Sequence, residues 1–124
     1  MPSVNKIELM GNLGKDPVLR SLPDGTAATK ISIACSEKWT DKQTGEIKEH
    51  IEWFPVLLYG RQAEVVCRYM KKGDCIQVWG KQRTRQYTDH EGAQRKVTEV
   101  YAAEMQIIYT ANRQESTEGI YGML

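Results

Sequence analysis

The residues of this chain best suited to chemistry are aromatic rings interleaved with cations. The rings stand at expected strand ends or on expected outward rows, with cations a few residues away: Trp39, Trp53, Tyr59 and Tyr87, beside Lys38, Lys42, Arg61, Arg83 and Arg85. Flat rings stack on unpaired bases and cations follow phosphates, and each stack is worth ~1–3 kcal/mol whatever the base. This combination predicts a surface for single-stranded nucleic acid.

The same rings could instead belong to a hydrophobic core. Trp39 borders a polar loop and Tyr87 lies within another, so the pattern favours their exposure. Trp53 lies in a stretch that is apolar on both faces, and the pattern leaves its position open between core and surface.

Catalytic and metal chemistry find little support in the sequence. The stretch GNLGKD (residues 11–16) lacks the spacing and the Ser or Thr of a phosphate-binding loop. His50 and His90 have no metal-type spacing to a cysteine, and Cys35 and Cys67 fall on expected core faces. The sequence therefore predicts no catalytic residue, no metal site, no cofactor and no enzymatic activity.

Length and composition indicate one globular domain. The 124 residues carry a net charge of +1, with 40% hydrophobic and 27% charged residues. Residues 61–96 hold nine Lys or Arg against four Asp or Glu, a local positive excess that suits a polyanion or a solvated surface. No apolar run approaches the roughly 18 residues of a membrane span, and no signal peptide is recognisable. Three widely spaced cysteines indicate reduced thiols and a cytoplasmic location.

Apolar periodicity predicts the elements that position these residues. Alternation indicates strands near residues 4–14, 27–39, 50–61, 75–85 and 97–109, with polar hairpin loops at 40–49 and 86–96. Ala63, Val66, Cys67 and Met70 share a helical stripe, and Gly73 is the expected end of that helix.

The third strand, HIEWFPVLLYGR (residues 50–61), carries apolar residues on both of its faces. We expect Phe54, Val56 and Leu58 to face the core and Trp53 and Tyr59 to face outward, about 20 Å apart along the strand. Three strands, a helix and two strands is the layout of an OB-fold, an all-β, five-stranded Greek-key barrel with one helix between its third and fourth strands. An SH3-like barrel or a small α+β sheet would show a similar pattern.

Long collinear blocks resemble the bacterial single-stranded DNA-binding protein family from Val4 to about Tyr109. They include VNKIELMGNLGKDPVLR, SEKWTDKQTGEIKEHIEW, VLLYGRQAEVVCRYMKKGD and QRTRQYTDHEGAQRKVTEV. The resemblance implies an OB-fold homotetramer that binds and protects single-stranded DNA without sequence preference, in replication, recombination and repair, in the cytoplasm with the nucleoid. A dimeric relative of the primosomal replication protein N type, acting in replication restart, is the alternative. An OB-fold nuclease would require a carboxylate cluster around a calcium ion, which the sequence does not offer.

The resemblance also implies site residues. Trp39, Trp53, Tyr59 and Tyr87 match the stacking positions of the family. The matching phosphate-binding positions are Lys6, Arg20, Lys42, Arg61, Lys72, Arg83, Arg85 and Arg95.

Three features depart from the family pattern. Phe54 and Pro55 replace polar or basic residues, and Pro55 removes a ladder donor, which would confine it to an edge or a bulge. Trp79 replaces a polar residue near the subunit interface, so we expect it to pack between subunits. Residues 1–110 are the expected DNA-binding domain and 111–124 a short flexible tail without the family's acidic tip. Either that tip has been removed or the chain is a short plasmid, phage or mobile-element member, so recruitment of replication proteins through the tip is not expected.

Overall fold

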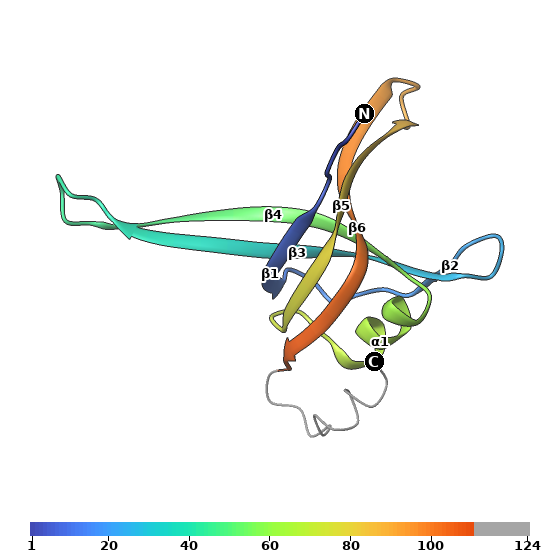
Figure 1. Cartoon of the computed structure of the whole chain (residues 1–124), viewed down its shortest axis with the longest axis horizontal. Coiled ribbons are helices and arrows are strands. Elements are labelled where there is room, and N and C mark those ends of the chain that lie inside the picture. The colour runs from blue at the N-terminus through green and yellow to red at the C-terminus, as the bar shows by residue number, and fades with distance from the viewer. Residues whose placement is uncertain (111–124) are drawn as a thin grey trace.

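The structure, a computed structural model, describes residues 1–110. The elements follow one another in this order (Figure 1): β1 (Ile7–Leu13), β2 (Arg20–Ser21), β3 (Ala27–Thr40), β4 (Ile47–Tyr59), α1 (Arg61–Tyr69), β5 (Cys75–Thr88) and β6 (Gln94–Tyr109). The predicted tail, 111–124, lies outside the described residues, so its flexibility stays a prediction. No helix within residues 1–110 is long and apolar enough to cross a membrane.

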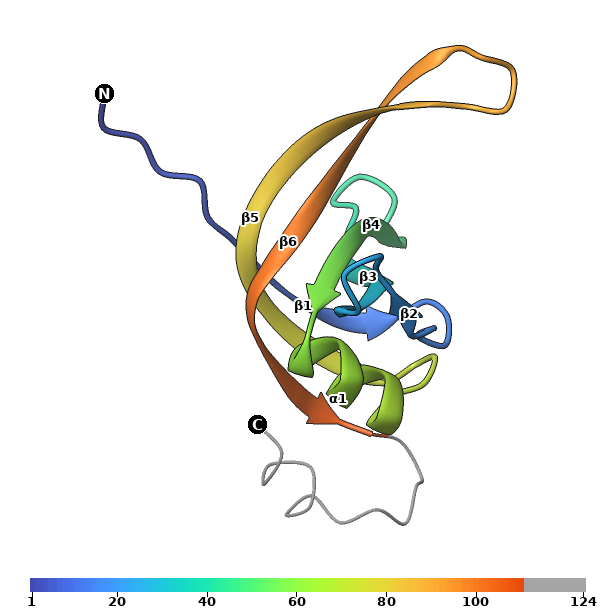
Figure 2. The same ribbon diagram turned by 90° about the vertical axis from the view of Figure 1, so that its right-hand side faces the viewer.

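Five long strands close into a barrel, which confirms the predicted OB-fold. The strand order is β1-β5-β6-β4-β3-β2, and β1 also pairs with β3 to close the ring. The pairing of β4 with β6 is parallel and all others are antiparallel. α1 lies against one end of the barrel (Figure 2). The short strand β2, paired with β3, was not predicted, because two residues are too few to show an alternation.

The barrel closes tightly where β1 crosses β3. The two strands pair at Asn12 with Ala34 and at Leu13 with Ile33. A Cβ atom on Gly11 would overlap the carbonyl of Ala34, so only glycine allows this approach of the two backbones.

The core contains Val56 and Leu58 of the predicted inward row of β4, together with residues of β1, β3, β5, β6 and α1. Phe54 and Cys35, which were also expected to face the core, are only partly buried at its edge. The buried apolar side chains are Leu9, Leu13, Ile31, Ile33, Val56, Leu58, Ala63, Val65, Val66, Met70, Cys75, Ile76, Val78, Val100, Met105 and Ile107.

Pro55 causes no loss of a ladder bond. The amide of Gly60 donates to the carbonyl of Ala27, and this contact fixes the alternation of bonds between β3 and β4. By that alternation Ser32 and Pro55 form a non-hydrogen-bonded pair, so the Pro55 nitrogen points away from β3. On the other side, β4 begins to pair with β6 only at Val56. Pro55 therefore occupies a free stretch of strand edge, as the sequence required, without a bulge.

Both hairpins are longer than predicted, and their loops are shorter. The β3–β4 hairpin (residues 27–59) pairs as far as Thr40 with Ile47, and the β5–β6 hairpin (residues 75–109) as far as Thr88 with Gln94. The predicted loops at 40–49 and 86–96 were wrong in extent, because polar residues continue the ladders beyond the core. The ends of the hairpins project from the barrel in different directions (Figure 1).

The helix is shorter than predicted. α1 ends at Tyr69 instead of near Gly73, because Met70 adopts an extended conformation and is buried. The amide of Asp74 donates to the carbonyl of Lys71, so the predicted last helical turn is a separate turn. Cys67, assigned to the core stripe, is only half-buried, and Val65 takes a buried place that was not predicted.

Candidate nucleic-acid interface

Two grooves meet on the outer face of the barrel, with Tyr59 at the end of β4 lining both. The first has a volume of about 700 Å³, and its basic and aromatic lining is Lys6, Tyr59, Trp79, Lys81, Arg83 and Tyr101. The second has a volume of about 500 Å³ and is lined in part by Lys15, Arg20, Lys30, Leu57, Tyr59 and Arg85. The two grooves share Tyr59, and cations line both of them.

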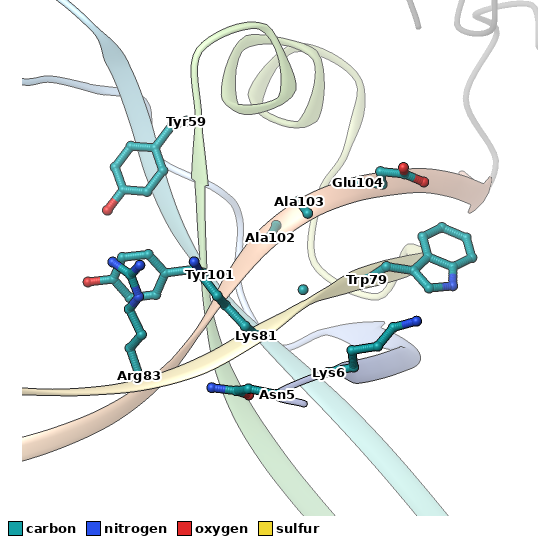
Figure 3. A pocket seen from close by; sticks show the side chains of 11 residues that line it. Asn5, Lys6, Tyr59, Trp79, Lys81, Arg83, Tyr101, Ala102, Ala103 and Glu104 are labelled. Carbon is teal, nitrogen blue, oxygen red and sulfur yellow. The ribbon is translucent and has the colours of Figure 1, made fainter. Parts of the chain in front are cut away.

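Rings and a guanidinium group are packed together where the grooves meet (Figure 3). The Tyr59 and Tyr101 ring centroids lie 6.2 Å apart with an interplanar angle of 45°. The Arg83 guanidinium carbon lies 5.1 Å from the Tyr101 ring centroid, within cation–π range. Tyr59 itself is 39% exposed. The arrangement therefore places the exposed Tyr59 ring next to a ring that is paired with a cation.

The outer face of the β5–β6 hairpin continues this surface. The register places Arg83, Arg85 and Tyr87 on the same side of β5, with Arg95 of β6 opposite Tyr87. The Arg85 guanidinium carbon lies 5.6 Å from the Tyr87 ring centroid, and Tyr87 is exposed. Four of the predicted site residues are thus brought onto one face of one hairpin.

Trp53 lies on the outer row of β4 that leads to Tyr59, as predicted. It is 52% exposed, which resolves the alternative that the sequence left open. Its ring packs over Gly14 at the end of β1, where any Cβ atom would overlap it. Trp53 therefore has one side supported by the barrel and much of its surface open to solvent.

Trp39 does not lie on that row. The register of β3 with β4 is unbroken, with Trp39 opposite Lys48 and Ala34 opposite Trp53. Alternate residues of a strand point to opposite faces, so Trp39 and Trp53 lie on opposite faces of the β3–β4 hairpin. Trp39 is 48% exposed near the hairpin end.

The predicted phosphate-binding cations are only partly brought together. Lys6 and Arg83 line the first groove and Arg20 and Arg85 the second, while Arg95 lies on the β5–β6 face. Lys42 lies in the loop of the β3–β4 hairpin, Arg61 begins α1 and Lys72 follows α1. These three line neither groove.

Sequence reasoning missed several residues of this face: Lys15, Lys30, Lys81, Glu99 and Tyr101. Lys30 belongs to the outward row of β3 and Lys81 to the local excess of positive charge, so both carried a signal. Glu99 carried none, because a buried acid on an outward row contradicts the usual alternation.

Glu99 is buried between two cations of this face. Its Oε1 accepts a hydrogen bond from Arg85 Nε at 2.8 Å, and its Oε2 lies 2.8 Å from Lys30 Nζ. Burial raises the pKa of Glu99, but the contacts with Arg85 and Lys30 outweigh it and hold the pKa below its usual value. Glu99 is therefore charged at neutral pH.

The two hairpin loops are built on the same kind of turn. Asp41 Oδ1 accepts hydrogen bonds from the amides of Gln43 and Thr44, and Asp89 Oδ1 accepts from those of Glu91 and Ala93. Each aspartate also pairs with a cation of the following strand, Lys48 or Arg95. For Asp41, the Gln43 amide and then Lys48 lower the pKa; for Asp89, Arg95 and then the Ala93 amide lower it. The loops are therefore ordered by ionised carboxylates at neutral pH.

Trp79 lies at the other end of the first groove from Tyr59, partly buried (Figure 3). The register places Glu8 of β1 and Glu104 of β6 beside it. Of these two carboxylates only Glu104 lines the groove, at the Trp79 end.

No group of three or more His, Cys, Asp or Glu among residues 1–110 could hold a metal ion. Cys35, Cys67 and Cys75 are all free thiols. Burial raises the pKa of the Cys35 and Cys75 thiols, which disfavours the reactive thiolate.

Comparison with known proteins agrees with this fold. Residues 4–108 match the single-strand binding protein family. Among solved structures, the chain is similar to Plasmodium falciparum SSB in complex with ssDNA, with 25% identity and a TM-score of 0.77, over 88% of this chain and 98% of that chain. Neither comparison favours the dimeric replication-restart alternative. The match covers almost all of the described residues, and the chain belongs to the single-strand binding protein family.

Proposed function

We propose that this protein binds single-stranded DNA without sequence preference, by stacking bases on aromatic rings and pairing phosphates with Lys and Arg. The observation that carries the proposal is the pair of cation-lined grooves that share the exposed Tyr59 ring. Family membership and the resemblance to an SSB solved with ssDNA support it. Stacking tolerates every base, so such a surface reads no sequence.

The positions of the rings support one path for the strand. Bases stack on Trp53 and Tyr59 along β4, and the backbone passes the cations of the second groove toward Tyr87 on the β5–β6 hairpin. Trp39 lies on the opposite face of the β3–β4 hairpin. A strand that contacts both Trp39 and Trp53 must therefore pass around an edge of that hairpin.

Competition between single-stranded and duplex DNA tests this proposal. A labelled oligo-dT should bind the protein, as measured by fluorescence anisotropy, and unlabelled oligo-dT should displace it while duplex DNA of the same length should not. In a duplex the base faces are stacked on each other and cannot reach Trp53 or Tyr59. Equal displacement by both competitors would contradict the proposal.

We further propose that the protein acts by binding alone, protecting single strands in replication, recombination and repair. We also propose a cytoplasmic, nucleoid-associated location, where single-stranded DNA would be available.

We also propose that the protein is a homotetramer, with Trp79 between subunits. Trp79 combines a large apolar ring with neighbouring Glu8 and Glu104, which suits another protein surface better than a polyanion. Met10, two residues after Glu8 on β1, is 50% exposed and adds apolar area to the same face of the sheet.

Replacing Trp79 tests the subunit contact. Trp79→Ala should shift the mass measured by analytical ultracentrifugation toward smaller species, because a buried aromatic anchor is lost from the interface. Ile47→Ala, which removes an exposed apolar side chain at the far end of the β3–β4 hairpin, is the control and should leave the mass unchanged. An intact tetramer with weakened DNA binding would show that Trp79 contacts DNA instead.

A further inference from the structure

A fully buried carboxylate lies under two half-exposed cations on the outer face. The Glu99 side chain is 0% exposed, whereas those of Lys30 and Arg85 are 46% and 48% exposed. A buried ion is costly unless it is paired and hydrogen-bonded. Here Oε1 accepts a hydrogen bond from Arg85, whereas Oε2 has no hydrogen-bond partner within residues 1–110 and is paired with Lys30 Nζ at 2.8 Å. Glu99 does not face the groove itself; its partners do.

One of these two ion pairs joins the β3–β4 hairpin to the β5–β6 hairpin. β4 and β6 pair only at Val56 with Val100 and at Leu57 with Tyr101, and Glu99 immediately precedes that short ladder. Lys30 comes from β3 and Arg85 from β5. The contact between Lys30 and Glu99 therefore links the two hairpins, while that between Arg85 and Glu99 lies within one of them.

The geometry leaves both cations able to bind a second anion. Glu99 occupies the Nε–H of Arg85, and the guanidinium lies over the Tyr87 ring, so its terminal amino groups keep donors for a phosphate. Lys30 has three donors and contacts Glu99 from one side. Side chains that are already fixed lose less conformational entropy when a ligand binds.

We infer that Glu99 is a positioning residue for the nucleic-acid face: it holds Lys30 and Arg85 across the junction of the hairpins, so that both engage one stretch of phosphate backbone in the second groove. The inference rests on the proposed function. A carboxylate that only neutralised positive charge would have the opposite effect on binding, because its removal would strengthen the attraction of a polyanion.

Glu99→Gln tests the inference because it keeps the shape and removes the charge. The side-chain oxygen of the new glutamine can accept a hydrogen bond from only one of the two cations. Its NH₂ group then faces the donors of the other cation and cannot accept from them. Either Lys30 or Arg85 is therefore released. We expect oligo-dT to bind roughly three- to tenfold more weakly, with a salt slope shallower by about 0.7 because one phosphate contact is lost. Tighter binding with a steeper slope, or unchanged binding, would overturn the inference.

Glu49→Gln is the matched control. Glu49 is exposed on β4 opposite Lys38 and makes no ion pair within residues 1–110, so its replacement removes the same charge without releasing a cation. We expect Glu49→Gln to bind oligo-dT as tightly as the wild type does, or slightly more tightly. A loss as large as that of Glu99→Gln would overturn the inference.

Arg85→Lys provides a second variant if Glu99→Gln does not fold. It keeps the positive charge but has no Nε–H for Glu99, and binding at least threefold weaker is expected; wild-type affinity would overturn the inference. The proposed function is tested separately by the wild type. If wild-type protein fails to bind oligo-dT, the proposed function fails; if it binds and Glu99→Gln binds equally well, only the role of Glu99 fails.

Discussion

Replacing Trp53 with alanine is expected to weaken binding of oligo-dT by roughly 5- to 150-fold, the loss of one base–aromatic stack worth ~1–3 kcal/mol. Trp53 is 52% exposed, supported by Gly14 on one side and aligned with Tyr59 on the outer row of β4. The ring is therefore held in place before a base arrives. Fluorescence anisotropy of a labelled oligomer measures the loss.

Two variants separate stacking from general damage at Trp53. Trp53→Phe keeps a flat ring and should retain most of the affinity. Tyr109→Ala removes a ring that is equally exposed but lines neither groove, and it should bind like the wild type. Thermal unfolding of all three variants should be close to that of the wild type, because exposed side chains contribute little to stability. Full affinity in Trp53→Ala would exclude this ring from the site.

Raising the salt concentration should weaken binding more than any single substitution. Each phosphate contact with a single strand contributes about −0.7 to the slope of log K against log salt, so about six contacts predict roughly a 300-fold loss between about 50 and 200 mM. The grooves contain enough cations for this number: Lys6, Lys15, Arg20, Lys30, Lys81, Arg83 and Arg85. A series of affinity measurements at increasing salt gives the slope.

Matched charge variants localise the effect. Arg83→Gln removes a cation of the first groove and should make the slope shallower by about 0.7. Arg68→Gln removes the same charge from α1, where Arg68 lies over Tyr69 and lines neither groove, and should leave the slope unchanged. A slope near zero in the wild type, or equal changes in both variants, would contradict the assigned face.

The fold could be predicted because residues along the core strands alternate between the barrel interior and the outer face in the expected order. On β4, the even-numbered Val56 and Leu58 are buried and the odd-numbered Trp53 and Tyr59 are exposed, as predicted for the two apolar rows of this strand. The lengths of the hairpins could not be predicted, since polar ladders beyond the core resemble loops in sequence. Thr40 and Thr88 are such residues, each paired in a strand where a loop was expected.

The site was less predictable than the fold, because it depends on which strands become neighbours. Tyr59 and Tyr101 are 42 positions apart and meet only through the short parallel pairing of β4 with β6. Lys42, Arg61 and Lys72 stand in suitable blocks of sequence, yet the fold places them outside both grooves. Local pattern identifies which residues could bind, and tertiary pairing decides which of them act together.

The most direct test of single-strand binding is a tryptophan fluorescence titration of the wild-type protein with poly-dT and with duplex DNA. Trp39 and Trp53 are about half exposed, so stacking of bases on them should quench their emission. We predict strong quenching by poly-dT and almost none by duplex DNA at the same nucleotide concentration. Equal quenching by both, or none by poly-dT, would contradict the proposed function.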